Sequence, residues 1–152
     1  MTGAPTLRLS LERDDLDGWR QSVDEHGSLT LTMAVPHAHT RPTFRAAVFD
    51  DEEDIETTAV RVVTELETVL SDCLLVESER LVEGPFGGDV AQITFAFRAG
   101  LRSCTYFQWI CETEGDHVVT ASLVCESEDA PIMAVIGPAL LGSLEVEADG
   151  AS

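Results

Sequence analysis

The sequence predicts an α+β fold in which an antiparallel sheet of about six to seven strands is flanked by an amphipathic helix and a C-terminal helix. Three observations lead to this prediction. Several short runs alternate apolar and polar residues, as half-buried strands do. Apolar residues recur at helical spacing after an acidic stretch at 50–54, and an apolar run ends the chain. With 152 residues, we expect a single domain, 1–152, with its core between about 7 and 147.

The N-terminal third predicts three strands. Leu7 to Glu12 alternates strictly, and a polar connection through Asp17-Gly18-Trp19 is expected to follow it. Leu29 to Val35 alternates again, and Pro36 ends this run because proline cannot donate to a strand ladder. The Pro, His and Thr content of 37–42 indicates a loop, after which Phe44 to Phe49 forms the third strand.

The amphipathic helix is predicted from Ile55 to about Leu70. Its N-terminus is rich in carboxylates, which complement the positive end of the helix dipole, and Asp54 is the expected N-cap. After the helix, Cys73 to Val82 has the composition of a long strand.

Three further strands are predicted to form an antiparallel meander with short turns. They span Ala91 to Arg98, Leu101 to Glu112 and His117 to Cys125. The turns are expected at Gly87-Gly88-Asp89, Ala99-Gly100 and Glu114-Gly115-Asp116.

The C-terminal helix is predicted from about Ile132 to Leu144, with Pro131 in its first turn. Gly137-Pro138 is expected to kink or split it, because proline lacks the N–H that the preceding turn needs. Apolar residues cover much of its circumference, which indicates either burial or a homodimer contact.

The charge balance excludes two classes of partner. Nine Lys+Arg, all of them arginine, stand against 28 Asp+Glu, giving a formal charge of −19. Such a field repels phosphate backbones and anionic lipid surfaces, so we expect neither nucleic acid nor membrane as partner. The first residues carry no signal-peptide pattern, and no apolar run reaches the roughly 20 residues of a membrane span. A cytoplasmic protein is expected.

The residues capable of chemistry form no catalytic or metal-binding pattern. Cys73, Cys104, Cys111 and Cys125 lie singly, without a C-x-x-C pair, and are predicted to be reduced structural thiols. His37 and His39 could give two ligands to zinc or copper, but two ligands do not make a site. The acidic run 50–54 lacks the spacing of a calcium loop, and no nucleophile elbow is present. We therefore expect no metal, no cofactor and no enzymatic activity.

Partner binding is predicted at one face of the strand from Leu101 to Glu112. Tyr106, Gln108 and Ile110 share that face, whereas Phe107 and Trp109 share the other. If the first face is not covered by a helix, it offers a mixed aromatic and polar surface of the kind favoured at interfaces.

An acidic rim is predicted beside this face, formed by Asp50, Asp51 and Glu52. A basic or apolar protein partner would suit the two features together.

The order of elements resembles the PsbP-like superfamily, in particular the bacterial branch of the LpqN-type proteins. The segments VPHAHTRPTFRAAVF and GDVAQITFAFRAG, the hairpin-linked strands after them and the final apolar helix match that branch from about Leu29 to Val146. The resemblance implies an α/β/α sandwich and a non-enzymatic accessory or chaperone-like role in binding a protein.

One alternative is a binder of small hydrophobic ligands. Its cavity would lie between helix and sheet and would be lined by Trp109, Phe95, Phe97 and Met133.

Overall fold

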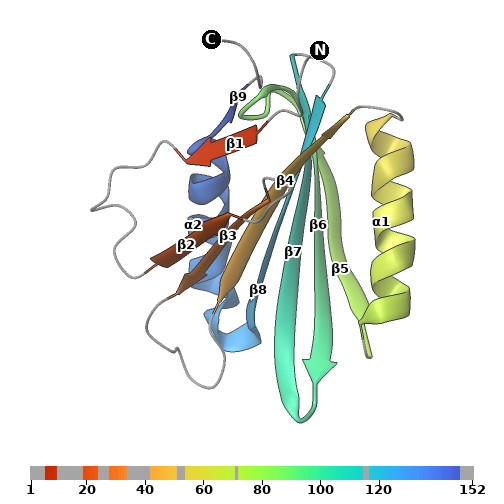
Figure 1. Cartoon of the computed structure of the whole chain (residues 1–152). Helices are drawn as coiled ribbons and strands as arrows, with labels where there is room; N and C mark the ends of the chain where they lie inside the picture. The colour runs from red at the N-terminus through yellow and green to blue at the C-terminus, as the bar shows by residue number, and fades with distance from the viewer. Residues whose placement is uncertain are drawn as a thin grey trace.

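A computed structural model of the chain describes residues 6–9, 19–23, 28–33, 42–50, 54–70, 72–114 and 117–147. Within these ranges the elements follow one another as shown in Figure 1. They are β1 (Thr6–Leu9), β2 (Trp19–Val23), β3 (Leu29–Met33), β4 (Thr43–Asp50), α1 (Ile55–Val69), β5 (Leu74–Leu81), β6 (Gly87–Ala99), β7 (Arg102–Thr113), β8 (His117–Glu126), the 3-10 helix η2 (Ser127–Asp129), α2 (Ala130–Gly142) and β9 (Leu144–Glu147). The predicted α+β fold with an antiparallel sheet and two flanking helices is confirmed.

Seven strands form one antiparallel sheet in the order β2-β3-β4-β8-β7-β6-β5. The strands β6, β7 and β8 make the predicted meander. The remaining strands, β1 and β9, pair with each other in a small second sheet at the two ends of the chain. None of the described helices is long and apolar enough to cross a membrane.

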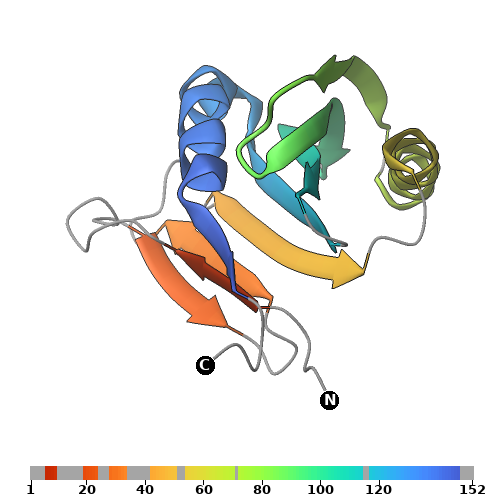
Figure 2. The same cartoon turned by 90° about the horizontal axis from the view of Figure 1, so that it is seen from above.

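The two helices lie on opposite sides of the seven-stranded sheet, which Figure 2 shows from above. We call the side packed against α2 the α2 face and the side packed against α1 the α1 face. Because side chains alternate along a strand, each strand contributes to both faces. Phe107, Trp109 and Cys111 of β7 point to the α2 face, and Ile110 points to the α1 face.

The α2 face is closely packed around Trp109, whose side chain is 2% exposed. Its ring lies 5.9 Å from that of Phe107 in a stacked arrangement and 6.4 Å from that of Phe44. A Cβ atom at Gly137 of α2 would lie 2.5 Å from Cη2 of Trp109, so only glycine allows the helix to approach this closely.

The start of α1 is the one predicted from the sequence. Asp54 has extended backbone angles, and its Oδ1 accepts a hydrogen bond of 2.7 Å from the backbone N–H of Thr57. This satisfies one of the donors that a helix N-terminus leaves unpaired. The helix then places Ile55, Val62 and Leu66 against the α1 face.

Two strands differ from the sequence-based prediction. Trp19 to Val23 forms β2 instead of a polar connection, because it pairs along its whole length with β3 and Trp19 packs against the α2-face core. Leu144 belongs to β9 and not to the helix, since α2 ends at Gly142 and the residues beyond it pair with β1.

Two local predictions are also wrong, and of the kink or split expected at Gly137-Pro138 the split does not occur. The hairpin between β6 and β7 turns through Gly100 and Leu101, because Ala99 pairs with Arg102 and Gly100 has a φ of 66°. Gly87 and Gly88 begin β6 with an irregular register, so the turn before it lies earlier. Pro138 stands inside α2 without splitting it.

Candidate binding site on the open half of the sheet

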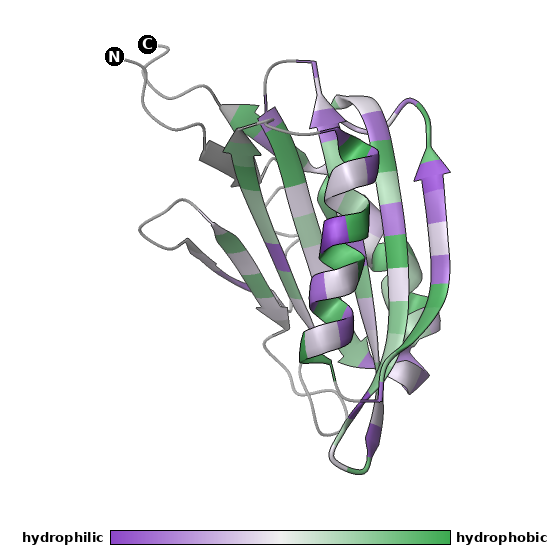
Figure 3. Cartoon of the chain, turned by 90° about the vertical axis from the view of Figure 1, so that its right-hand side faces the viewer, coloured by the Kyte–Doolittle hydropathy of each residue, from purple (hydrophilic) through white to green (hydrophobic). Residues whose placement is uncertain are grey.

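Helix α1 covers only part of the α1 face. Its main contacts are with β6 and β7, and it reaches Val118 of β8, whereas Thr120 and Ser122 of β8 and the neighbouring residues of β4 lie outside the cluster that it covers. Figure 3 looks onto α1 and the strands beside it. We call the uncovered part, formed by Arg45 and Ala47 of β4 and by Thr120 and Ser122 of β8, the open half.

Strand register brings the polar side chains of this region into a row. Ser122 of β8 lies directly opposite Arg45 of β4 on one side and Gln108 of β7 on the other. Thr120 is opposite Ala47. Residues directly opposite in neighbouring strands share a face and lie within side-chain contact distance.

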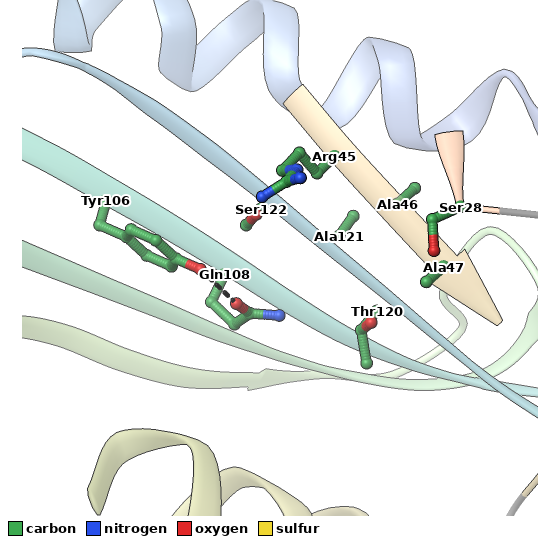
Figure 4. A pocket seen from close by; sticks show the side chains of 9 residues that line it. All are labelled: Ser28, Arg45, Ala46, Ala47, Tyr106, Gln108, Thr120, Ala121 and Ser122. Atoms are coloured by element: carbon green, nitrogen blue, oxygen red, sulfur yellow. Dashed lines mark hydrogen bonds between the residues drawn. The ribbon is translucent and has the colours of Figure 1, made fainter. Parts of the chain in front are cut away.

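A pocket of about 280 Å³ lies on this row and opens to solvent. Figure 4 shows the side chains around it. They are Ser28, Arg45, Ala46, Ala47, Tyr106, Gln108, Thr120, Ala121 and Ser122. The volume is at the lower limit of small-molecule pockets, and hydroxyl, amide and guanidinium groups supply its polar lining.

Hydrogen bonds hold one end of the pocket in place. The hydroxyl of Tyr106 donates to Oε1 of Gln108 at 3.2 Å, and Nε2 of Gln108 donates to the backbone oxygen of Trp109 at 3.3 Å. The phenolic oxygen of Tyr106 keeps its acceptor capacity, because its only proton is already donated.

Arg45 differs from those arginines of the described chain that pair with carboxylates. Arg80 pairs with Glu56 at 2.6 Å and with Asp89 at 2.8 Å, and Arg61 pairs with Glu65 at 3.6 Å. Arg45 is exposed, and the described residues provide it with no ion pair. No Asp or Glu of the described ranges lines the pocket, although the chain holds 28 acidic residues. The pocket is therefore a local site of positive charge in an acidic protein.

The partner-binding residues predicted from the sequence lie in different environments. Tyr106 is half-buried at the edge of the open half, and Gln108 is 7% exposed beside Ser122. Ile110 is 0% exposed because α1 covers that end of β7, so it offers no surface on the free protein. Asp51 and Glu52 lie outside the described residues.

Asp50 is the last residue of β4, and its place in an acidic rim stays a prediction. The residues that sequence reasoning missed are Arg45, Thr120 and Ser122. Their signal is alternation: on β8 the two hydroxyl residues stand between buried Val119, Ala121 and Leu123. Arg45 likewise stands between buried Phe44 and Ala46.

The predicted lining of a hydrophobic cavity is not brought together. Trp109 and Met133 belong to the α2-face core, whereas Phe95 belongs to the α1-face core. Phe97 pairs with Cys104 and shares the α1 face with Phe95. The sheet therefore separates Trp109 and Met133 from Phe95 and Phe97.

All four cysteines are free, as predicted. Burial raises the pKa of the Cys111 thiol and that of the Cys125 thiol to about 12 each, which keeps both protonated at neutral pH. Burial also raises the pKa of Cys104. These are the properties of structural thiols and not of nucleophiles.

The metal prediction is tested only in part. Among the described residues, no group of three or more His, Cys, Asp and Glu could hold a metal ion. His37 and His39 lie outside the described part of the chain, so the prediction that they form no metal site stays a prediction.

No protein-family model and no curated protein matches the chain significantly by sequence. Solved structures do match its fold. LpqN of Mycobacterium tuberculosis, described as involved in cell envelope biogenesis, superposes with a TM-score of 0.66 at 14% identity, covering 95% of this chain and 85% of LpqN.

Two further structures agree with this match. Cyanobacterial PsbP from Synechocystis gives a TM-score of 0.58 at 12% identity, covering 95% of this chain and 94% of its own. The Ran-binding protein Mog1p of Saccharomyces cerevisiae gives 0.55 at 9% identity, covering 92% and 89%. At these identities the similarity shows a shared fold, and the resemblance inferred from the sequence is confirmed at that level. None of these three proteins is described by a catalytic activity.

Proposed function

We propose that this chain, which has the PsbP-like fold, is a non-enzymatic accessory or chaperone-like protein that binds another protein on the open half of its sheet. The observation behind the proposal is the row of Arg45, Ser122 and Gln108 beside Tyr106, which lines a pocket open to solvent on the α1 face of the sheet. One structure of the same fold is described as a Ran-binding protein, which makes a binding role on this fold a reasonable expectation.

The chemistry of the open half favours a protein over a small molecule. A broad sheet surface with a pocket of about 280 Å³ at its centre cannot enclose a ligand as a deep cleft does. Tyrosine and arginine are enriched among residues that dominate protein–protein affinity, and both stand at this pocket. A partner can therefore spread over the strands and insert one side chain.

The surrounding charge would act mainly on association. With a net charge of −19, the protein attracts partners whose surface is basic and repels acidic ones at long range. The carboxylates of Asp50, Asp51 and Glu52 belong to this proposal as a rim that raises the association rate. A reducing, cytoplasmic location is also proposed, and the free cysteines support it.

The proposal is tested by placing a photo-crosslinking amino acid at two positions in turn. Thr120 lies at the pocket of the open half, and Val135 lies on the outer side of α2 at 72% exposure. In native lysate, position 120 should give one dominant crosslinked protein in stoichiometric amount, and position 135 should not. The reverse result would move the binding surface to α2.

A binding measurement with the captured protein adds energetic information. Tyr106→Ala should weaken its affinity by about 2 kcal/mol, because aromatic anchors at an interface centre carry much of the binding energy. The thermal unfolding of the variant is the control for an intact fold. Unchanged affinity would exclude this part of the open half from the interface.

A further inference from the structure

We propose that the pocket around Arg45 binds the carboxylate of an acidic side chain, Asp or Glu, presented by the protein partner. This inference rests on the proposed function, because it names the chemistry that the same site recognises. The pocket is positively charged although the protein as a whole is acidic. Three of its properties lead to the inference.

The first property is an available guanidinium. Arg45 is exposed, and no carboxylate of the described chain pairs with it, whereas Arg80, Arg61 and Arg102 are all engaged by Glu or Asp. A planar guanidinium binds a carboxylate through two parallel hydrogen bonds, which is the strongest pairing open to it. The chain has 28 acidic residues, but none of those in the described part lines this pocket, which keeps the arginine available.

The second property is the set of neutral donors beside Arg45. Ser122 lies directly opposite it, and Thr120 is two residues away on β8. Neither hydroxyl is hydrogen-bonded to another residue of the described chain. Figure 4 shows the Arg45 side chain lying beside Ser122, with the small Ala46, Ala47 and Ala121 leaving room around it. A carboxylate at this point can accept from the guanidinium and from a hydroxyl together.

The third property is the acceptor at the opposite end. The phenolic oxygen of Tyr106 donates its proton to Gln108 and so remains an acceptor at the pocket. The partner residue that carries the carboxylate also has a backbone N–H, which is a donor. The carboxylate therefore matches Arg45 at one end of the pocket, and the backbone N–H matches the Tyr106 oxygen at the other.

Charge discriminates between anions. A single guanidinium neutralises one negative charge, while the net charge of −19 opposes the second charge of a phosphate. A monoanionic carboxylate surrounded by neutral or basic residues is therefore the best match. The acidic surroundings would then select against partners with further acidic residues near the inserted one.

The test uses the full chain and a defined probe, N-acetylglutamate N-methylamide, titrated while backbone amide and arginine Nε–H resonances are followed by NMR. We expect saturable shifts at Arg45, Ser122 and Tyr106. Arg45→Gln should reduce the affinity at least about tenfold, because a charge-assisted hydrogen bond is lost. Arg98→Gln is the matched control, since Arg98 is also exposed and without an ion pair in the described chain, and it should leave the affinity unchanged.

Three further probes separate the alternatives. The neutral isostere N-acetylglutamine N-methylamide should give no saturable shift at Arg45. Tighter binding of N-acetylglycine, which carries a terminal carboxylate, or of inorganic phosphate would overturn the assignment to an acidic side chain. Absence of any Arg45 shift with the glutamate probe would overturn it as well. The crosslink from position 120 can still succeed in that case, so failure of this inference is distinguishable from failure of the proposed function.

Discussion

The two faces of the seven-stranded sheet are built by the same strands but differ in what covers them. On the α2 face, buried apolar side chains extend from β3 across β4, β8 and β7 to β6 and pack against Met133, Leu140 and Leu141 of α2. On the α1 face, the apolar cluster lies beneath α1 around Ile93, Phe95 and Ile110 and gives way to the open half.

This difference in helix covering explains where the strands carry polar side chains. On β8, alternate positions are buried beneath α2 along the whole strand, whereas the intervening ones change from Val118 under α1 to Thr120 and Ser122 beyond it. A sheet face that lacks a covering layer has to carry side chains that tolerate water. Helix placement therefore explains why an otherwise regular strand is amphipathic over only part of its length.

The largest contrast between the faces is expected in thiol reactivity. Cys111 and Cys125 belong to the α2-face core, and burial raises each pKa from 9.0 to about 12, which lowers the thiolate fraction about 1,000-fold at neutral pH. Cys73, near the end of α1, is only partly buried. Ellman's reagent should therefore react quickly with one thiol of the native protein and with all four after denaturation.

Cys73→Ser is the control for the assignment of the fast-reacting thiol to Cys73. It should remove the fast phase and leave the slow reaction of the other three thiols unchanged. Fast modification of Cys111 or Cys125 in the native state would mean that the α2 face opens. Fewer than four thiols in denaturant would contradict the reduced state of the protein.

Truncating the centre of the α2 face should give the largest loss of stability. Trp109→Ala removes a ring that stacks on Phe107 and touches Gly137, and we expect the free energy of unfolding to fall by about 3–5 kcal/mol in urea denaturation. Tyr106→Ala, at the half-buried edge of the open half, should cost less. Equal losses would show that the two faces contribute equally to stability.

The contact between α2 and the sheet can be tested without removing atoms. Gly137→Ala should destabilise by about 1–3 kcal/mol, since the added Cβ would lie 2.5 Å from the Trp109 ring, although alanine is the better helix former. Gly142→Ala in the same helix is the matched control, because nothing lies within 4 Å of its Cβ position. A neutral effect at 137 would indicate that Trp109 can shift.

A smaller, pH-dependent effect is expected on the α1 side. The backbone N–H of Thr57 holds the pKa of Asp54 below its usual 3.8. A carboxylate with a depressed folded-state pKa stabilises the protein above its unfolded-state pKa, and this contribution disappears as pH falls through the folded-state value. Asp54→Asn keeps a cap acceptor but cannot titrate.

The melting temperatures of wild type and Asp54→Asn should therefore differ at pH 7 and begin to converge as the pH falls below about 4. Convergence is the expected outcome because protonated Asp54 no longer carries the charge that complements the helix dipole. A constant difference across that pH range would contradict the role assigned to the charge.

The smallest effect is expected in the open half. Ser122→Ala should change the free energy of unfolding by no more than about 0.5 kcal/mol, because the side chain is only partly buried and is not hydrogen-bonded to another residue of the described chain. Its consequence should be confined to binding. A loss of stability comparable to that of Gly137→Ala would mean that Ser122 supports the fold instead of a partner.

Local pattern in the sequence determined most of the elements. Alternation and strand-type composition identify β3, β4, β6, β7 and β8, and helical spacing with an acidic cap identifies α1. Short connections require the central meander to be antiparallel, because a parallel pair needs a long crossover. The single cysteines also predict free thiols, since each stands among apolar or strand-forming neighbours and none has a C-x-x-C partner.

The candidate site follows from the sequence only in part. Alternation along β7 identifies Tyr106 and Gln108, but it places Ile110 on the same surface because nothing in the sequence says where α1 lies over that face. Arg45 and Ser122 escape sequence reasoning because they become neighbours only through the register between β4 and β8. Each of them alone is an ordinary polar strand residue.

Tertiary structure decided the features that depend on contacts between distant parts of the chain. The strand β9 exists because β1 pairs with it from the other end of the chain, and β2 exists because β3 pairs with it. The position of α1 over β6 and β7, which leaves the open half uncovered, is likewise a result of packing. Periodicity shows which side chains share a face, but burial and pairing with distant segments decide whether that face is core or binding surface.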